Sequence, residues 1–306
     1  MKFDVICGNP PYQTKSEASV TKTQSLWHKF VHKSFDLLKD GGYLCLVHPS
    51  GWRNVNGRFE ETKNLLLSKD IRHVEMYDKE QGFKTFGART MYDWYVLQNV
   101  PSTTRSTTIR GQDGKLSSVN LSRFQFVPSG MFSEIESLIA KDGEPTVEVA
   151  RDASNFHTQH PNMSKDGEER VEVLYDRTAY GSDKKNMSKE KVGKFQHPCV
   201  YMVRVNDEPV TWCSSTNTNG HFGVPKLIWG NGGYEMGSLI DATGEYGLTQ
   251  FAYGIVDTPK NLPLIKKAFD SEKFRNLMRY CDGGDSNINR KVIALFRKDF
   301  WKQFID

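Results

Sequence analysis

Apolar and polar positions in the first half of the chain follow two alternating patterns. Residues 3–7 read FDVIC, and this short apolar run predicts a strand buried on both faces of a parallel sheet. Apolar positions from Leu26 to Leu38 recur instead at helical spacing, and Gly41-Gly42 is expected to close that helix. Further strands are predicted at 43–47, 71–77, 91–97 and 107–110, and further helices at 58–69 and around 135–139. This alternation predicts an α/β sheet with crossover helices.

The pattern changes near residue 145, where glycine, asparagine and serine become dense and the alternation fades. We therefore predict two domains, residues 1–145 and residues 146–306, the second of mixed α+β structure. Residues 13–24 are polar without periodicity, which predicts a loop. In the second domain, strands are expected at 200–205 and 226–229, and helices at 262–269 and 272–280.

The composition bears on where the protein is located and on whether it holds disulfides or a metal ion. The 306 residues are 37% hydrophobic and 25% charged, and no apolar run is long enough to cross a membrane. The acid Asp4 argues against a secretory leader, and the five cysteines form no C-x-x-C pair, so we expect a cytoplasmic protein with reduced thiols. His157 and His160 have no neighbouring ligands, so no metal site is predicted.

Charge is mildly positive, at +4 overall, which permits a nucleic-acid partner without requiring one. One short segment concentrates the positive charge, with Asp183 and Glu190 as its local acids. It is either a solvated loop or a loop that contacts phosphates. Its lysines are Lys184, Lys185, Lys189, Lys191 and Lys194.

The residues after the FDVIC strand, Asn9, Pro10, Pro11 and Tyr12, are the candidate active site. Open α/β sheets hold their sites at the carboxyl ends of strands. The two prolines fix the backbone and remove two N–H donors, which leaves carbonyls as acceptors. The Asn9 amide oxygen and the Pro10 carbonyl can accept both N–H bonds of an exocyclic amino group, and Tyr12 offers an aromatic face for its ring. The loop therefore predicts chemistry at such a nitrogen.

This loop resembles the catalytic motif of adenine-N6 DNA methyltransferases from restriction–modification systems. The segments GGYLCLVHPSGW and GFKTFGARTMYDWYVLQ resemble later motifs of that family, and KLIWGNGGYE and NINRKVIALF are similar to parts of its target-recognition domains. The resemblance implies a partial Rossmann-like methyltransferase sheet and a double-stranded DNA substrate whose adenine is flipped out. It also implies that Tyr12 stacks on one face of the adenine and Phe86 on the other. Phe83 is the competing residue, and a core position is the alternative for both.

The resemblance implies S-adenosylmethionine as cofactor, yet its usual glycine-rich site precedes the catalytic loop, and only eight residues precede Asn9. In LIWGNGGYEMG the glycine spacing does not fit the dinucleotide fingerprint, and Asp241 and Glu245 follow too closely. Residues 281–285, CDGGD, fit no better. A turn in the recognition domain is the preferred interpretation of LIWGNGGYEMG.

The strand before the loop lies mid-sheet in that family, so without its earlier neighbours it presents an unpaired apolar edge. Three accounts remain open: a second polypeptide supplies the cofactor half, the chain is a remnant, or its sheet closes differently around another donor site. The first is preferred.

Two rival functions also remain open. Enzymes that methylate a protein glutamine amide use a similar loop. A non-catalytic DNA-binding subunit would keep the recognition domain and use the loop only to grip a base. Neither G-x-S-x-G nor a phosphate-binding G-x-x-x-x-G-K-[ST] occurs.

Overall fold

The computed structural model of the chain describes residues 2–16, 19–102, 106–151, 187–218, 220–284 and 286–305. They form two compact units. Unit 1 comprises Met1–Ser137 with Tyr280–Ser286, and unit 2 comprises Leu138–Arg279 with Asn287–Asp306. The boundary predicted near residue 145 treats both parts as continuous, whereas each of these units is built from two separate segments.

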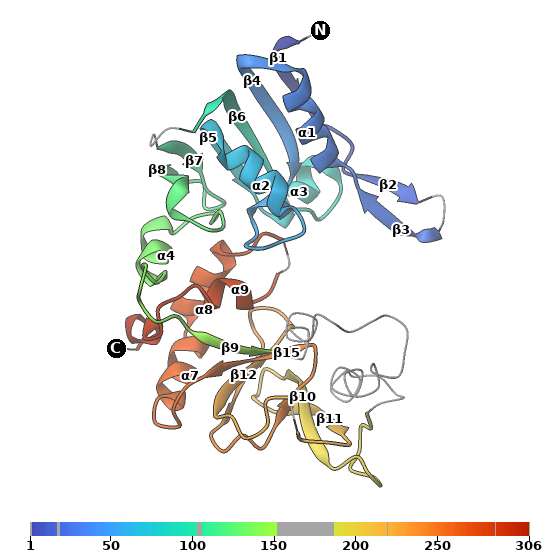
Figure 1. Cartoon of the computed structure of the whole chain (residues 1–306), viewed down its shortest axis with the longest axis vertical. Helices are drawn as coiled ribbons and strands as arrows, with labels where there is room; N and C mark the ends of the chain where they lie inside the picture. Colours follow the sequence, from blue (N-terminus) through green and yellow to red (C-terminus); the bar gives the residue numbers. More distant parts are fainter. Residues whose placement is uncertain are drawn as a thin grey trace. The chain divides into compact units, whose positions relative to one another are not determined.

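Unit 1 contains a six-stranded mixed sheet of order β1-β4-β6-β5-β7-β8 (Figure 1). Strand β1 runs parallel to β4, and β5 runs parallel to β7, while β6 is antiparallel to both β4 and β5. Helix α1 packs on β4 and helix α2 on β5. This sheet with packed helices confirms the α/β class. The strands are β1 (Phe3–Gly8), β4 (Leu38–Pro49), β5 (Lys69–Tyr77), β6 (Tyr92–Pro101), β7 (Thr107–Arg110) and β8 (Leu116–Val119); the helices are α1 (Trp27–Leu37), α2 (Glu60–Leu67), α3 (Lys79–Phe86) and α4 (Phe132–Leu138).

Strand β1 exists as predicted, but its predicted burial on both faces is wrong. It is an edge strand that pairs only with β4 among the residues that the structure describes. Phe3 is 43% exposed and Val5 is 59% exposed. By contrast, Leu44 in β4 is fully buried, because β4 has a paired strand on each side and a helix on one face.

The glycine pair at 41–42 has a different role from the predicted helix cap. Helix α1 ends at Leu37, and Gly41 and Gly42 lie inside β4. Gly41 has φ +78°, and a Cβ on Gly42 would stand 2.8 Å from the Asp4 carbonyl oxygen. The pair therefore allows β4 to bend close to β1, which requires residues without side chains.

The polar segment predicted as a loop is a β-hairpin. Strands β2 (Gln13–Ser16) and β3 (Ser19–Ser25) pair antiparallel as a two-stranded sheet. Alternating apolar residues mark strands that cover a core. A hairpin that forms its own sheet has no such face, so this signal is missing from its sequence.

The segment Tyr280–Ser286 is seated on unit 1 by backbone contacts. The Ser129 amide donates to the Tyr280 carbonyl oxygen at 2.8 Å, and the Ser50 hydroxyl donates to the Gly283 carbonyl oxygen at 3.1 Å. A Cβ on Gly283 would stand 2.1 Å from the Asn54 side-chain oxygen, so this approach requires glycine.

Unit 2 contains a four-stranded sheet of order β13-β12-β15-β9 and a three-stranded sheet of order β11-β10-β14. Residues such as Val200, Ile228 and Leu248 form a buried cluster within it. Strands and helices are thus mixed, as predicted. The strands are β9 (Glu148–Arg151), β10 (His197–Val203), β11 (Pro209–Ser214), β12 (Lys226–Gly230), β13 (Ser238–Asp241), β14 (Gly247–Leu248) and β15 (Ala252–Val256); the helices are α7 (Leu262–Asp270), α8 (Glu272–Tyr280) and α9 (Arg290–Ile293).

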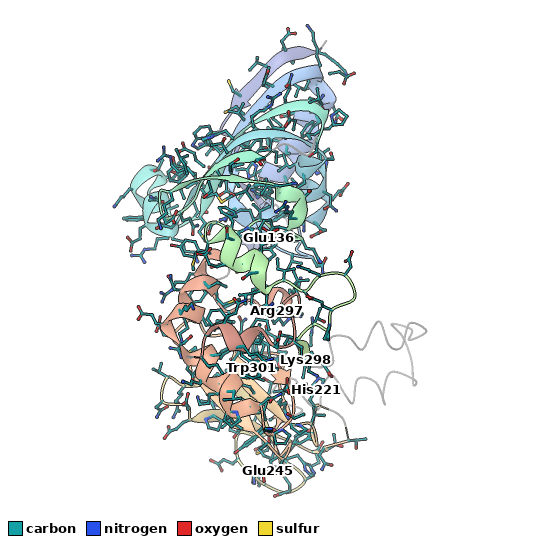
Figure 2. The ribbon with its side chains drawn as sticks, turned by 90° about the vertical axis from the view of Figure 1, so that its left-hand side faces the viewer. Glu136, His221, Glu245, Arg297, Lys298 and Trp301 are labelled. Atoms are coloured by element: carbon teal, nitrogen blue, oxygen red, sulfur yellow. The ribbon has the colours of Figure 1, made fainter. Side chains whose placement is uncertain are left out.

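The last residues of the chain close unit 2. Figure 2 shows Arg297, Lys298 and Trp301 on this segment. The Arg297 amide donates to the Leu138 carbonyl at 2.8 Å, and the Lys298 amide donates to the Pro145 carbonyl at the same distance. The segments that enter and end unit 2 are therefore paired. Within the described ranges, no helix has the length and apolar character needed to cross a membrane.

Candidate active site

The catalytic-loop candidate follows β1 at the carboxyl end of that strand. Asn9 and Pro11 are exposed, Pro10 is buried and Tyr12 is half-buried. The Tyr12 carbonyl accepts a hydrogen bond from the Leu26 amide at 2.9 Å, which ties the end of the loop to the start of α1. Buried Pro10 and this bond fix both sides of the loop, while the Asn9 side chain stays accessible.

Tyr12 belongs to a group of aromatic rings from three elements. Its ring meets that of Phe86 edge to face, with centroids 6.0 Å apart and planes at 77°. Phe86 meets Tyr92 in the same manner at 4.8 Å, and Tyr92 stacks on Tyr77 at 4.6 Å with planes 6° apart. Thr85 joins the group through a 3.2 Å hydrogen bond to the Tyr92 hydroxyl. Helix α3 and strands β5 and β6 thus provide an aromatic wall beside the loop.

The Tyr12 hydroxyl is buried and has no hydrogen-bond partner in the described part of the chain. Burial, reinforced by nearby Tyr92, raises the pKa of Tyr12 to about 12. The phenol is therefore neutral at physiological pH and retains a proton that it can donate. An unpartnered buried hydroxyl is costly, which is typical of a position shaped for a ligand.

Phe86 and Phe83 are both accessible, at 36% and 55% exposure. The alternative prediction, that both phenylalanines are core residues, is therefore wrong. Because the planes of Tyr12 and Phe86 are nearly perpendicular, a base held between two parallel faces would require one of these rings to turn.

Helix α3, which carries both phenylalanines, was not predicted as a helix. Its start is fixed by a capping box, in which the Gln81 amide donates to the Asp78 carboxylate at 2.8 Å and the Asp78 amide to the Gln81 side chain at 3.0 Å. Its end is fixed by Gly87 at φ +68°. These caps were the available sequence signal.

His48 is a core residue that packs against Trp27, the first residue of α1. It is fully buried, its ring stacks on Trp27 at 4.4 Å, and its Nδ1 lies 3.0 Å from the Pro49 carbonyl oxygen. Burial lowers the pKa of His48 to about 4, so the imidazole is neutral and its Nδ1–H donates to that carbonyl. Its Nε2 then accepts from the Tyr95 hydroxyl at 3.3 Å.

The glycine-rich segment of β12 does not fit S-adenosylmethionine. A Cβ on Gly230 would stand 3.0 Å from the Met202 Cα, and one on Gly232 would stand 2.8 Å from the Met236 side chain. The space above both glycines is therefore filled by the protein itself. Asp241 is buried and bonded to the Lys226 ammonium at 2.7 Å, so its carboxylate is not available to a ribose.

The segment at 281–285 gives the same result as far as it is described. The Asp282 carboxylate accepts from the Gly284 amide at 2.7 Å and from the Ser286 amide at 2.8 Å, which folds the segment on itself. The Asn54 side chain fills the space next to Gly283, so a ligand has no room there. Neither glycine segment provides a cofactor cradle. Within the described ranges, no group of His, Cys, Asp and Glu is arranged to hold a metal ion; His157 and His160 lie outside them.

Of the predicted basic run, Lys184 and Lys185 lie outside the described residues. Lys189, Lys191 and Lys194 are exposed on the loop before β10 in unit 2. Lys189 lies 5.6 Å from the centre of the Trp212 ring, and Lys194 lies 5.4 Å from that of Phe195. Their ammonium groups are therefore accessible to an anionic partner of unit 2.

Comparison with known proteins gives one family model and two sequence relatives, each of which matches about a third of the chain or less. Residues 1–83 match the model of the Eco57I restriction-modification methylase family. The modification methylase CviBIII of Paramecium bursaria Chlorella virus NC1A is 32% identical over 113 residues, which cover 35% of this chain and 29% of that protein. An uncharacterized adenine-specific methylase of Mycoplasma pneumoniae is 30% identical over 104 residues, or 32% of this chain and 24% of that protein. These matches span less than a third of either relative.

Solved structures with some likeness include the type IIL restriction-modification enzyme MmeI in complex with DNA. It has a TM-score of 0.48 and 11% identity, with 95% of this chain and 45% of that chain covered. The M protein of the type I restriction enzyme EcoKI has a TM-score of 0.29 and 14% identity, with 46% and 36% covered. The resemblance to methylases of restriction–modification systems, predicted from the Asn-Pro-Pro-Tyr loop, is confirmed by the family model and the two sequence relatives.

Proposed function

We propose that this chain carries the catalytic loop of a site-specific DNA methyltransferase that modifies the N6 amino group of adenine. The proposal rests mainly on the exposed Asn9 at the end of β1, which lies in the same loop as Tyr12, and on the contact of the Tyr12 ring with Phe86 of the aromatic wall. The match of residues 1–83 to a restriction-modification methylase family supports the same reaction class.

In the proposed mechanism, the loop makes a poor nucleophile reactive. The adenine amino group is unreactive because its lone pair is delocalised into the ring. The Asn9 amide oxygen and the Pro10 carbonyl oxygen accept its two N–H bonds, which favours a pyramidal nitrogen with an available lone pair. As positive charge develops on that nitrogen, the same two oxygens stabilise it. Because the two prolines restrict the backbone that carries the Pro10 carbonyl oxygen, this acceptor needs little reorganisation during the reaction.

Tyr12 is proposed to hold the flipped adenine by stacking on its ring, with Phe86 closing on the opposite face. In the present arrangement the two rings touch edge to face. Entry of a base between them would replace this contact by two stacking contacts. The Tyr12 hydroxyl, neutral and without a partner in the described part of the chain, would also remain available as a donor.

S-adenosylmethionine is the proposed methyl donor and supplies, when bound, a methyl group on a positively charged sulfur. Neither the glycine-rich segment that begins in β12 nor the segment at 281–285 provides a cradle for it. Among the described residues, β1 pairs only with β4, which leaves its other edge free. We propose that the cofactor-binding half adds strands at this edge, where Phe3 and Val5 are 43% and 59% exposed. A second polypeptide is the preferred source. Unit 2, with Lys189, Lys191 and Lys194, is proposed to contact the duplex around the target.

The decisive experiment replaces Asn9 by Ala in the complex purified from the native source. The variant is expected to lose methyl transfer about 100-fold or more, because one of two oxygens that stabilise the developing charge is removed. DNA affinity should change by less than about threefold, since this oxygen acts mainly on the developing charge. Asn64→Ala, an exposed asparagine on α2, is the matched control and should retain parent activity.

The product is identified by digesting the DNA and measuring N6-methyladenine by mass spectrometry. Equal rates for Asn9→Ala and its parent would contradict the role given to the loop. If a glutamine in release factor is methylated and DNA is not, the chain is a protein-glutamine methyltransferase instead. If DNA is bound but nothing is methylated, the chain is a non-catalytic DNA-binding subunit.

A further inference from the structure

Helix α1 begins beside the candidate catalytic loop with a basic first turn. The Leu26 amide donates to the Tyr12 carbonyl at 2.9 Å, and α1 starts at the next residue, Trp27. His28 and Lys29 follow in its first turn, so both lie near the end of the loop. Within the described part of the chain, no side chain caps this helix start. A cation at the positive end of a helix dipole is unfavourable unless an anion compensates it.

The segment before α2 brings a second cation to the same place. Helices α1 and α2 contact each other, and Arg58 lies two residues before α2 begins at Glu60. The guanidinium carbon of Arg58 is 5.4 Å from the centre of the Phe59 ring, and the His28 ring is 5.2 Å from that same ring. The Phe59 ring therefore connects the arginine before α2 to the first turn of α1.

The charges around His28 show that these side chains converge. Burial lowers the pKa of His28, and the positive charges of Arg58 and Lys29 lower it further. His32, one turn along α1, acts in the same direction, and Glu61 acts against them. His28 is therefore neutral at pH 7.5, which leaves Lys29 and Arg58 as the two cations of this place. We call Lys29 and Arg58 the α1 cation pair.

The α1 cation pair has no acidic partner among the residues that the structure describes. Both side chains are exposed, and neither forms an ion pair there. Lys33, one turn further along α1, instead pairs with Asp36 at 3.5 Å. Neighbouring cations repel each other, and an anion bound between them would replace this repulsion by attraction. The α1 cation pair is therefore suited to an anionic ligand.

We propose that the α1 cation pair binds the phosphate backbone of the DNA beside the target adenine. This inference rests on the proposed function. A base that reaches Tyr12 stays joined to its own strand, so the phosphates that flank it pass close to the loop and to the start of α1. Lysine neutralises a phosphate as a point charge, and arginine can bind one through two parallel N–H bonds.

This contact positions the DNA strand and does not read its sequence. Bonds to phosphates fix the register and orientation of a duplex but carry no sequence information directly. A strand held at the α1 cation pair is anchored next to the base that leaves the stack. The contact belongs to unit 1 and is separate from the lysine-bearing loop of unit 2.

The test measures binding of a fluorescein-labelled duplex to the full chain by anisotropy at several salt concentrations. Lys29→Ala combined with Arg58→Ala should weaken binding and lower the slope of log Kd against log salt by about one to two, at roughly 0.9 per phosphate contact. Lys115→Ala combined with Arg123→Ala is the matched control, because it also removes one lysine and one arginine. These two residues are 82% and 62% exposed and flank β8, the strand at the opposite edge of the sheet from β1. The slope of the control should equal that of the parent.

Glu61→Gln changes the charge in the opposite sense and should tighten binding severalfold at low salt, because it removes the acid that opposes the α1 cation pair. Unfolding midpoints of all variants are compared with the parent, since changes at exposed positions should leave stability intact. If the Lys29→Ala, Arg58→Ala variant keeps the slope of the parent, or if Glu61→Gln does not tighten binding, the inference is overturned and the proposed function stays intact. If the parent binds no DNA at all, the proposed function fails, and this inference with it.

Discussion

The ion pair between Arg53 and Asp93 in the core of unit 1 leads to a quantitative prediction of stability. The Arg53 Nε lies 3.1 Å from Asp93 Oδ2, and the two side chains are 1% and 0% exposed. The Trp52 indole nitrogen donates to the same oxygen at 2.9 Å. Asp93→Asn keeps the shape of the side chain and removes its charge, so that the guanidinium is left in the core without a counter-ion.

Removing one partner of a buried ion pair costs about 3–5 kcal/mol, because the remaining charge is neither solvated nor compensated. Domains have a free energy of unfolding of about 5–15 kcal/mol in total. We therefore expect Asp93→Asn to lower the unfolding midpoint by roughly 10 °C. The substitution also lies next to the candidate active site, since Tyr92 of the aromatic wall is the preceding residue of β6.

The assay is urea unfolding followed by tryptophan fluorescence, with thermal unfolding in parallel. It is run at pH 7.5, because burial raises the pKa of Asp93 to about 6 and the parent carboxylate must be ionised. Asp4→Asn is the matched control: Asp4 pairs with Lys39 at 2.8 Å, but its side chain is 80% exposed. This control should leave the midpoint unchanged. If Asp93→Asn is no more destabilising than Asp4→Asn, the buried pair does not carry an uncompensated-charge penalty and the reasoning is refuted.

Two further predictions concern pH and the β1 edge. Folded His48 has a pKa lowered to about 4, so its stability contribution is present above about pH 6.5 and is lost as pH falls towards 4. The free-energy difference between parent and His48→Gln should therefore shrink by roughly 1.5 kcal/mol from pH 6.5 to pH 5, and a constant difference in urea titrations would contradict this. Val5→Lys, at a 59% exposed edge position, should preserve the unfolding midpoint and reduce self-association in light scattering. As a control, Leu46→Lys, at a 4% exposed position, should unfold the chain. If Val5→Lys scatters light as the parent does, the β1 edge does not drive self-association.

Sequence patterns were sufficient where burial imposes periodicity. Helices α7 and α8 were predicted to within a residue, because each has an apolar face that is buried against a core. Strand β7 was predicted with its observed bounds, and its alternate residues Thr107 and Ile109 are buried. Helix α3 shows the opposite case. Its phenylalanines, Phe83 and Phe86, are exposed, so the helix has no buried apolar face. Only its caps indicate the helix in the sequence.

The candidate site was predictable only in its local part. Asn9 to Tyr12 are consecutive, so their rigid loop is visible in the sequence. The aromatic wall joins Tyr77, Phe86 and Tyr92 through the pairing of β5 with β6, and nothing in their spacing reveals that contact. The exposure of β1 depends on which strands pair with it, which is a property of the whole sheet.

The seating of Tyr280–Ser286 on unit 1 has a consequence for biosynthesis. These seven residues leave the ribosome after nearly all of unit 2, so the nascent amino-terminal unit cannot finish folding when its own first segment has emerged. Until then the Ser129 amide and the Ser50 hydroxyl lack the carbonyls that they later contact. An expression fragment cut after residue 145 would carry the same defect permanently, and adding the missing heptapeptide in trans offers a way to restore it.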